Sequence, residues 1–245
     1  ENHPEKMPPK ISISKNVSTA FDKLWTTHKL DKAPETLALA ANRAYRQYDL
    51  TSALEYCKEL TALDPLCPTA SFVYVATLLA LDHKRLLFQL AHEWVQACPK
   101  SAHSWFAVGS YYYACGRFHV AQRHYCRATR LDPQCTEAWI AFGCSFAMSD
   151  ETDQALASFR AAQRLAPAHN VPLLYMGMEY LRTNHLVLAR HFLMAANKTS
   201  HGGDPLCLHE LGVADYQRKE FATAAVWFQR ALMASGGKLE EHSSS

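Results

Sequence analysis

Histidine and cysteine are the side chains of this sequence that could bind a metal ion or act as nucleophiles. The 245 residues include 13 His and 8 Cys, but no two cysteines form a Cys-x-x-Cys pair. The nearest approach to a zinc-protease motif, His209-Glu210-Leu211-Gly212-Val213, lacks the second His one helical turn later. A Walker loop, a Gly-x-Gly-x-x-Gly motif and a Gly-x-Ser-x-Gly turn are also missing from the sequence. We therefore expect no catalytic residues, no metal site and no cofactor, and a protein that is not an enzyme.

Charge and hydropathy also limit the classes of partner. The 25 Lys and Arg against 23 Asp and Glu give a net charge of +2, so no global field favours nucleic acid or an anionic membrane. No apolar run approaches the ~20 residues of a membrane-spanning helix, and the N-terminal residues lack a secretory signal. We expect neither a nucleic-acid nor a membrane partner, and reduced cysteines that serve in packing.

One local cluster of charge stands out against this balance. Arg123, Arg127 and Arg130 share a helix face at i, i+4 and i+7, and no acidic residue follows them until Asp132. The cluster is a candidate patch for an acidic partner. A solvated outer surface and an RNA contact are the alternatives, although no aromatic residues interleave with the arginines for base stacking.

An internal repeat is the element that must position all of these residues. Between Ser104 and Pro167 the sequence matches itself at a shift of 34 residues. The paired positions are Trp105 and Trp139, Gly109 and Gly143, Tyr112 and Phe146, Ala121 and Ala155, Tyr125 and Phe159, Ala128 and Ala162, and Pro133 and Pro167. This period and these offsets are the tetratricopeptide (TPR) pattern of two antiparallel helices per repeat. An ordinary amphipathic stripe would not hold one register over two repeats.

The same register predicts the organisation of the chain. Prolines at repeat ends recur in steps of 34, and Asp49 is the predicted N-cap of the second helix of the first repeat. We predict an all-α TPR solenoid of about six helix–turn–helix repeats in a right-handed superhelix. Its segments are a disordered tail 1–16, an N-terminal helix 17–33, repeats 34–67, 68–101, 102–135, 136–169, 170–204 and 205–234, and a disordered tail 235–245.

The first helices of such repeats line an inner groove, which is apolar and aromatic in this chain. Exposed apolar surface of this kind marks a binding site for a helix or an extended segment. A tight superhelical twist that hides some of these side chains is the alternative. The predicted groove residues are Phe72, Leu79, Phe106, Tyr113, Ile140, Leu174, Leu181 and Tyr216.

The amino-acid sequences of the repeats are more specific than the general TPR pattern. SWFAVGSYY, AWIAFGCSFA, DQALASFRAAQRL, PLLYMGMEY and HELGVADYQ occur in this order. They closely resemble the cell-division-cycle-sixteen subunits of the anaphase-promoting complex, a multi-subunit ubiquitin ligase of mitosis. The resemblance covers residues 102–232 and extends more weakly over 34–101.

This resemblance implies a non-catalytic scaffold in cell-cycle control, located in nucleus and cytoplasm. It implies a homodimer formed through N-terminal repeats and contacts with other TPR scaffold subunits of the ligase. The family holds a small accessory subunit with later repeats, so we expect that site to be missing from a chain of six repeats. The alternative is a generic TPR adaptor that binds a peptide or helix of another complex.

Overall fold

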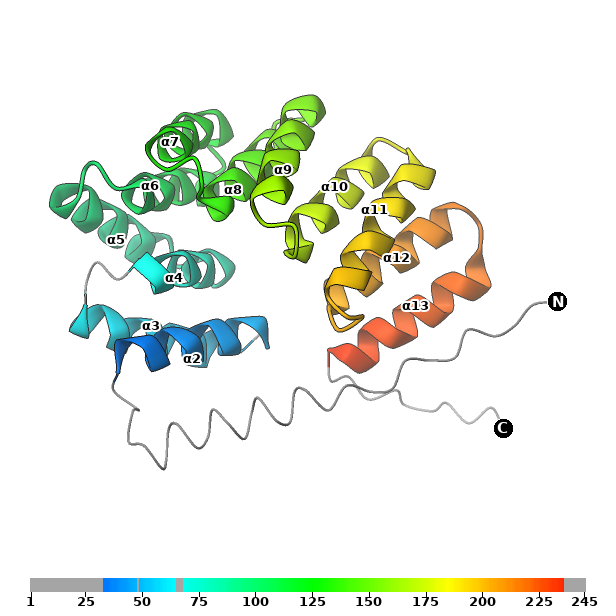
Figure 1. The fold of residues 1–245 in the computed structure, drawn as a ribbon, viewed down its shortest axis with the longest axis horizontal. Coiled ribbons are helices and arrows are strands. Elements are labelled where there is room, and N and C mark those ends of the chain that lie inside the picture. The colour runs from blue at the N-terminus through cyan, green and yellow to red at the C-terminus, as the bar shows by residue number, and fades with distance from the viewer. Residues whose placement is uncertain (1–32, 48, 65–67, 236–245) are drawn as a thin grey trace. The chain divides into compact units, whose positions relative to one another are not determined.

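A computed structural model describes residues 33–47, 49–64 and 68–235 of the chain. All regular elements in these residues are α-helices, which confirms the predicted all-α class, and they form two compact units that divide after Asp82. The first unit holds α2 (Pro34–Arg46), α3 (Leu50–Leu63) and α4 (Pro68–Ala80). The second unit holds α5 (Lys84–Ala97), α6 (Ala102–Ala114), α7 (Phe118–Leu131), α8 (Thr136–Ala147), α9 (Thr152–Leu165), α10 (Asn170–Arg182), α11 (Leu186–Thr199), α12 (Pro205–Gln217) and α13 (Phe221–Ala234) (Figure 1).

Some predicted segments lie outside the described residues. These are the tail 1–16, the N-terminal helix 17–33 apart from Ala33, and the tail 235–245 apart from Ser235. The division between the two units falls inside the predicted repeat 68–101, with α4 in one unit and α5 in the other. The helix pairs within single units are α2 with α3, α6 with α7, α8 with α9, α10 with α11, and α12 with α13. In each pair we call the first helix A and the second helix B.

A repeated turn joins helix A to helix B in the second unit. Gly116, Asp150, Asn184 and Lys219 occupy this turn with φ between 60° and 72°, the left-handed region that ends many helices. In the first of these turns the Arg117 amide donates to the Tyr112 carbonyl at 2.9 Å, and in the next three the same bond measures 3.0, 2.8 and 2.9 Å. These bonds satisfy carbonyls at the end of each A helix, so the turns fix the antiparallel return.

The crossing of helices A and B depends on a glycine in each A helix. A Cβ added at Gly109 would lie 2.7 Å from the Tyr125 ring, and one at Gly143 would lie 2.5 Å from the Phe159 ring. Gly177 and Gly212 show the same approach, at 2.6 Å from the residue 16 positions later. The glycines therefore let a large B-helix side chain sit directly on the A-helix backbone.

Several helices end at the prolines of the repeat. Helices α3, α5, α7 and α9 each end two residues before a proline, which cannot continue the helical hydrogen bonding. Trp105 and Trp139 each donate an indole hydrogen bond to the carbonyl of the preceding repeat-end proline, at 2.7 and 3.0 Å. Asp49 accepts from the Ser52 amide at 3.2 Å, which confirms the predicted N-cap of α3.

Successive A helices contact one another in the second unit, α6 with α8, α8 with α10, and α10 with α12. The second unit is curved, and Figure 1 shows α7 and α9 on the outside of this curve, with α6 and α8 toward the inside. The second unit thus has an inner side formed by A helices and an outer side formed by B helices. No helix in the described part of the chain is both long and apolar enough to cross a membrane.

Candidate functional site

The described His, Cys, Asp and Glu side chains do not gather into a metal site, and several of the thiols are held protonated by their surroundings. The described residues contain no cluster of three or more His, Cys, Asp or Glu that could hold a metal ion. Burial raises the thiol pKa of Cys57, Cys135, Cys144 and Cys207 to about 12. These four thiols therefore stay protonated near neutral pH, where a nucleophile or metal ligand would be a thiolate. The surfaces of the array are what remains to be considered as a functional site.

Three of the predicted groove residues lie in the core. Phe106 is 7% exposed and packs on Tyr125 with ring centroids 5.8 Å apart. Leu174 and Leu181 are 3% and 7% exposed and belong to one core cluster with Leu193 and Leu211. The prediction that these three line an open groove is corrected by this packing. The physical reason is that Tyr125 of α7 packs on Phe106, whereas Leu193 of α11 and Leu211 of the next A helix pack with Leu174 and Leu181.

The other predicted groove residues keep some accessible surface. Tyr113 is half-buried, stands edge-on to Phe118 at 5.4 Å, and has its pKa raised to about 12 by burial. Ile140 is half-buried, whereas Tyr216 is 59% exposed. In the first unit, Phe72 and Leu79 are half-buried on α4. The inner side of the second unit is thus a partly covered surface, and its role in partner binding stays a prediction.

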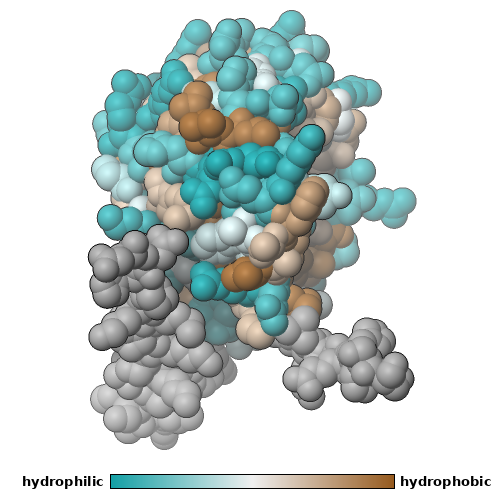
Figure 2. All heavy atoms as spheres, turned by 90° about the vertical axis from the view of Figure 1, so that its right-hand side faces the viewer, coloured by the Kyte–Doolittle hydropathy of each residue, from teal (hydrophilic) through white to brown (hydrophobic). Residues whose placement is uncertain are grey.

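Exposed apolar side chains also gather at the α11–α13 end of the second unit. The large ones are Val187, Leu188, Met194, Leu206, Tyr216, Phe221, Val226, Leu232 and Met233. Figure 2 views this side and shows brown hydrophobic spheres in separate patches between hydrophilic ones. The apolar surface is therefore divided into small areas by polar side chains.

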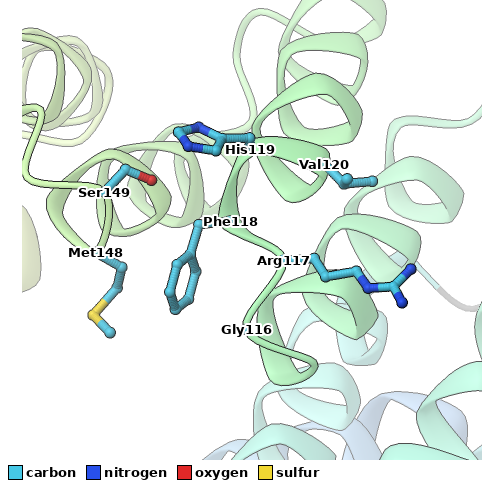
Figure 3. Close-up of a pocket in the computed structure, with 7 residues that line it drawn as sticks. All are labelled: Gly116, Arg117, Phe118, His119, Val120, Met148 and Ser149. Atoms are coloured by element: carbon cyan, nitrogen blue, oxygen red, sulfur yellow. The ribbon is translucent and has the colours of Figure 1, made fainter.

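An open depression lies beside the A–B turn of the repeat formed by α6 and α7. Its volume is about 420 Å³, and its walls include Phe118, His119 and Met148. Figure 3 shows the Phe118 ring and the Met148 side chain pointing into the same space, while Arg117 points away from it. Two apolar side chains from different repeats could hold a small apolar group of a partner there, and no buried polar group of this pocket provides specificity.

The predicted acidic-partner patch lies on the outer side, on α7. Arg123, Arg127 and Arg130 are all exposed. The guanidinium carbon of Arg127 lies 3.6 Å from the centroid of the Trp105 ring, a cation–π contact. These three side chains are thus on the surface, as the sequence predicted, and their role in binding stays a prediction.

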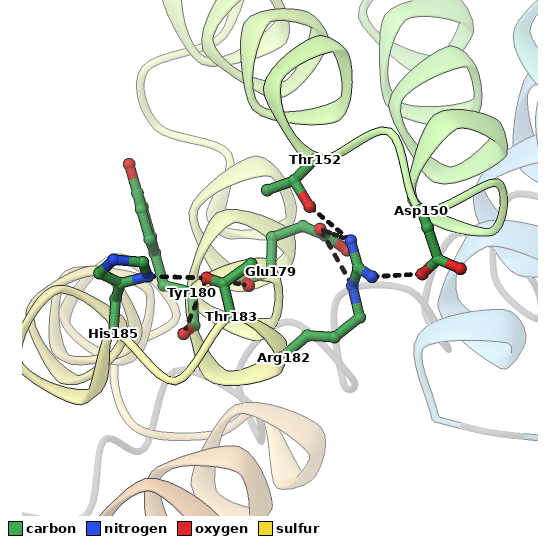
Figure 4. Close-up of polar contacts among 7 residues, drawn as sticks. All are labelled: Asp150, Thr152, Glu179, Tyr180, Arg182, Thr183 and His185. Atoms are coloured by element: carbon green, nitrogen blue, oxygen red, sulfur yellow. Dashed lines mark hydrogen bonds and ion pairs between the residues drawn. The ribbon is translucent and has the colours of Figure 1, made fainter.

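Two buried carboxylates that join neighbouring helices were missed by the sequence reasoning. Glu179, 6% exposed, accepts from Arg182 at 2.9 and 3.3 Å, and Arg182 also donates to Thr152 at 2.6 Å and pairs with Asp150 (Figure 4). This network joins α10 to the start of α9. Arg182 is therefore held between two repeats.

The second buried carboxylate is Asp215, which has no exposed surface. It accepts from the Arg190 guanidinium and from the Trp227 indole, each at 2.9 Å. The repeat register could have revealed it, because the same A-helix position carries Tyr112, Phe146 or Tyr180 in the three preceding repeats. An acidic residue at an aromatic core position indicates a buried ion pair.

Comparisons with known proteins agree with this architecture. A family model described as tetratricopeptide repeat matches residues 92–170. Anaphase-promoting complex subunit 6 of Arabidopsis thaliana is 39% identical over 204 residues, which cover 82% of this chain and 37% of that protein. The cell division cycle protein 16 homolog of Homo sapiens is 36% identical over 208 residues, 83% of this chain and 33% of its own length. The predicted resemblance is confirmed over most of this chain.

A solved structure shows the same fold. The crystal structure of the APC/C hetero-tetramer Cut9-Hcn1 superposes with a TM-score of 0.85 at 28% identity and covers 94% of this chain and 44% of the matched chain. The chain is therefore a TPR solenoid, as predicted. It spans about a third of the length of the two sequence relatives that it matches, 37% and 33%.

Proposed function

We propose, from the homology of this chain to the subunits named CDC16, APC subunit 6 and Cut9, that it is a scaffold of the anaphase-promoting complex. The observation that carries the proposal is sequence identity of 39% and 36% over 204 and 208 residues, a length of several repeats. In this role the chain holds other subunits in place and does not itself carry out ubiquitin transfer. Its partners are other TPR scaffold subunits of the ligase, in nucleus and cytoplasm.

Partner contact is assigned to the inner side of the array. Tyr113, Ile140 and Tyr216 offer accessible apolar and aromatic surface on three A helices of the second unit, α6, α8 and α12. Phe72 and Leu79 offer the same kind of surface in the first unit. The small accessory subunit of the family is assigned to repeats beyond these six, so we expect this chain alone not to retain it.

The first experiment is affinity purification of the tagged chain from dividing cells, followed by mass spectrometry. Recovery of cullin, RING and TPR subunits of the ligase is expected. Gly143→Leu, which overpacks the crossing of α8 and α9, is a control that disturbs the array without changing its surface. Recovery of chaperone, trafficking or RNA-processing proteins in place of ligase subunits would favour the generic TPR adaptor.

Self-association is the second part of the proposal. Light scattering should give twice the chain mass of 27.6 kDa at micromolar concentration. Leu39, which is 57% exposed on α2, gives a test of the N-terminal repeats: Leu39→Glu should weaken the dimer without removing a core side chain. Leu63→Glu, at an equally exposed position at the end of α3, is the matched control. A chain that stays monomeric at tens of micromolar with full helicity would contradict the dimer.

A further inference from the structure

The charge of the second unit is segregated between its two kinds of helix. The odd-numbered helices α5 to α13 carry nearly all of its helical cations and few acids. Their basic residues are Lys84, Arg85, Arg123, Arg127, Arg130, Arg160, Arg164, Arg190, Lys198 and Arg230, and their acidic residues are Glu93 and Asp153. The even-numbered helices α6 to α12 carry Glu137, Glu179, Glu210 and Asp215 and the single cation Arg182. A chain with a net charge of only +2 therefore has a basic outer side.

Three of these cations occupy one position in three consecutive repeats. Arg130, Arg164 and Lys198 are each separated by 34 residues, and each lies exposed in the last turn of its B helix. A cation in this position is favoured by the helix dipole. The dipole does not account for Arg123 and Arg127, which lie earlier on α7. We call Arg123, Arg127, Arg130, Arg164 and Lys198 together the basic row.

The basic row has no acidic counterpart in the part of the chain that the structure describes. None of its five members forms an ion pair there, whereas Arg182, Arg190 and Arg218 are paired with carboxylates. Unpaired cations that share a surface repel one another, which destabilises the array slightly. A ligand with complementary negative charge would remove this repulsion.

The ring contacts around Arg127 favour an acidic protein segment over nucleic acid. One face of Trp105 is covered by the Arg127 guanidinium, and the Trp105 ring also stacks with the His124 ring at 5.7 Å and 7°. His124 in turn stacks with Tyr112 at 5.3 Å and 6°. These rings already stack on one another, so less ring surface is left for the base stacking that single-stranded nucleic acid needs. The same contact holds the Arg127 side chain in place, which reduces the entropy lost on binding a carboxylate.

We propose that the basic row binds an acidic segment of a partner protein, rich in Asp and Glu, that runs across the outer side of α7, α9 and α11. The proposal goes beyond the scaffold function, because it uses the B helices and leaves the inner side and the dimer unaffected. Carboxylates spaced along an extended chain would meet cations from three successive repeats. Binding of this kind is weakened by salt, since the contacts are exposed.

The test uses the full chain and a fluorescent peptide of about 12 residues made of Asp, Glu and Gly, with an Asn and Gln version as the neutral control. Anisotropy should show binding of the acidic peptide at about 50 mM salt that weakens at about 300 mM, and no binding of the neutral one. The triple variant Arg130→Glu, Arg164→Glu, Lys198→Glu should bind about tenfold or more weakly. The matched control is Arg85→Glu, Lys100→Glu, Lys219→Glu, which makes the same change in net charge at other exposed positions and should change binding little.

Folding of both triple variants is checked by circular dichroism. If the Glu variant loses helicity, the triple Gln variant of the same three positions replaces it and should still bind more weakly than the control. Equal losses in both triple variants would mean attraction by net charge alone and would overturn the proposal. Tighter binding of a single-stranded oligonucleotide of equal charge would also overturn it. Neither result affects recovery of ligase subunits, so failure here is distinct from failure of the scaffold proposal.

Discussion

Gly143 gives the sharpest test of how the repeats are packed, because a single methyl group should destabilise the array. A Cβ at this position would lie 2.5, 2.7 and 3.0 Å from three ring carbons of Phe159. Phe159 is 1% exposed and stacks on Tyr175 at 5.5 Å, so the ring is held on its other side. We predict that Gly143→Ala lowers the free energy of unfolding even though Ala is the better helix former.

The magnitude follows from two opposing effects. Replacing Gly by Ala inside a helix favours folding by ~1 kcal/mol. Ordinary carbon contacts need about 3.5–4 Å, so the ring or the helix would have to move by about 1 Å, and overpacking of a core costs ~1–3 kcal/mol. Packing should win by about 1 kcal/mol, a fall in Tm of roughly 2–4 °C for a chain of this size. Gly143→Leu should cost more, since its branched side chain has no space at the crossing.

Thermal melts followed by circular dichroism measure the effect, and hydrogen exchange in α8 and α9 shows where the loss occurs. Local exchange matters because a solenoid can lose one repeat without complete unfolding. Ala157→Gly, at an exposed position of α9, is the control for helix propensity and should cost ~1 kcal/mol. In the background Phe159→Ala the clash is gone, so Gly143→Ala should there be neutral or stabilising, with a coupling of about 1–2 kcal/mol.

The reasoning would be refuted if Gly143→Ala raised the Tm in the wild-type background. That result would mean that the helices do not cross at Gly143 as closely as the structure shows. If Gly143→Ala destabilised the Phe159→Ala variant as much as the wild-type protein, the contact partner would be a different side chain.

Two further predictions concern charged groups in the second unit. Asp215→Ala removes the acceptor of Arg190 and of the Trp227 indole, and it should lower the free energy of unfolding by about 2 kcal/mol. This is less than the ~3–5 kcal/mol of a fully buried pair, because the Arg190 side chain is 35% exposed. An unchanged denaturant midpoint would contradict this prediction. Burial, with Arg127 and Arg123 nearby, lowers the pKa of His124 in the folded chain below its usual value of 6.5, so its contribution to stability is present above pH 6.5 and is lost as the pH falls through the folded pKa. His124→Gln should therefore reduce the drop in Tm between pH 7 and pH 5, and an equal drop in both proteins would count against this account.

The fold could be predicted from sequence because each repeat needs the same residue types at the same positions. A glycine is needed wherever a large B-helix side chain packs directly on the backbone of an A helix. Gly109 and Gly143 meet this need in two repeats, so they recur at a fixed spacing. The prolines recur because each B helix must end at the same place. Such local requirements appear in the amino-acid types themselves, and one chain with two clear copies is enough to reveal them.

Burial on the inner side could not be predicted in the same way. Helical spacing shows which face of an A helix points inward, but the exposure of Phe106, Leu174 and Leu181 depends on the side chains of other helices that pack on them. Such tertiary packing, within a repeat and between repeats, involves residues far apart in sequence. Arg190 and Asp215 illustrate the same limit, because the ion pair joins helices of two repeats 25 residues apart.

Repeats differ in sequence at positions outside the close crossing of helices A and B, and these differences show which contacts can replace one another. Tyr112 stacks on His124, and the equivalent Tyr180 stacks on Phe192 at 5.3 Å, whereas in the last repeat Asp215 bonds Trp227 instead. All three arrangements join helix A to helix B, so packing tolerates them equally. The outer surfaces of the B helices are less constrained still, because no carboxylate in the described chain pairs with a member of the basic row. The helix dipole favours Arg130, Arg164 and Lys198 in the last turns of their helices, but it does not account for Arg123 and Arg127. A negatively charged ligand would complement all five cations, and this is why we place its binding site on the outer side.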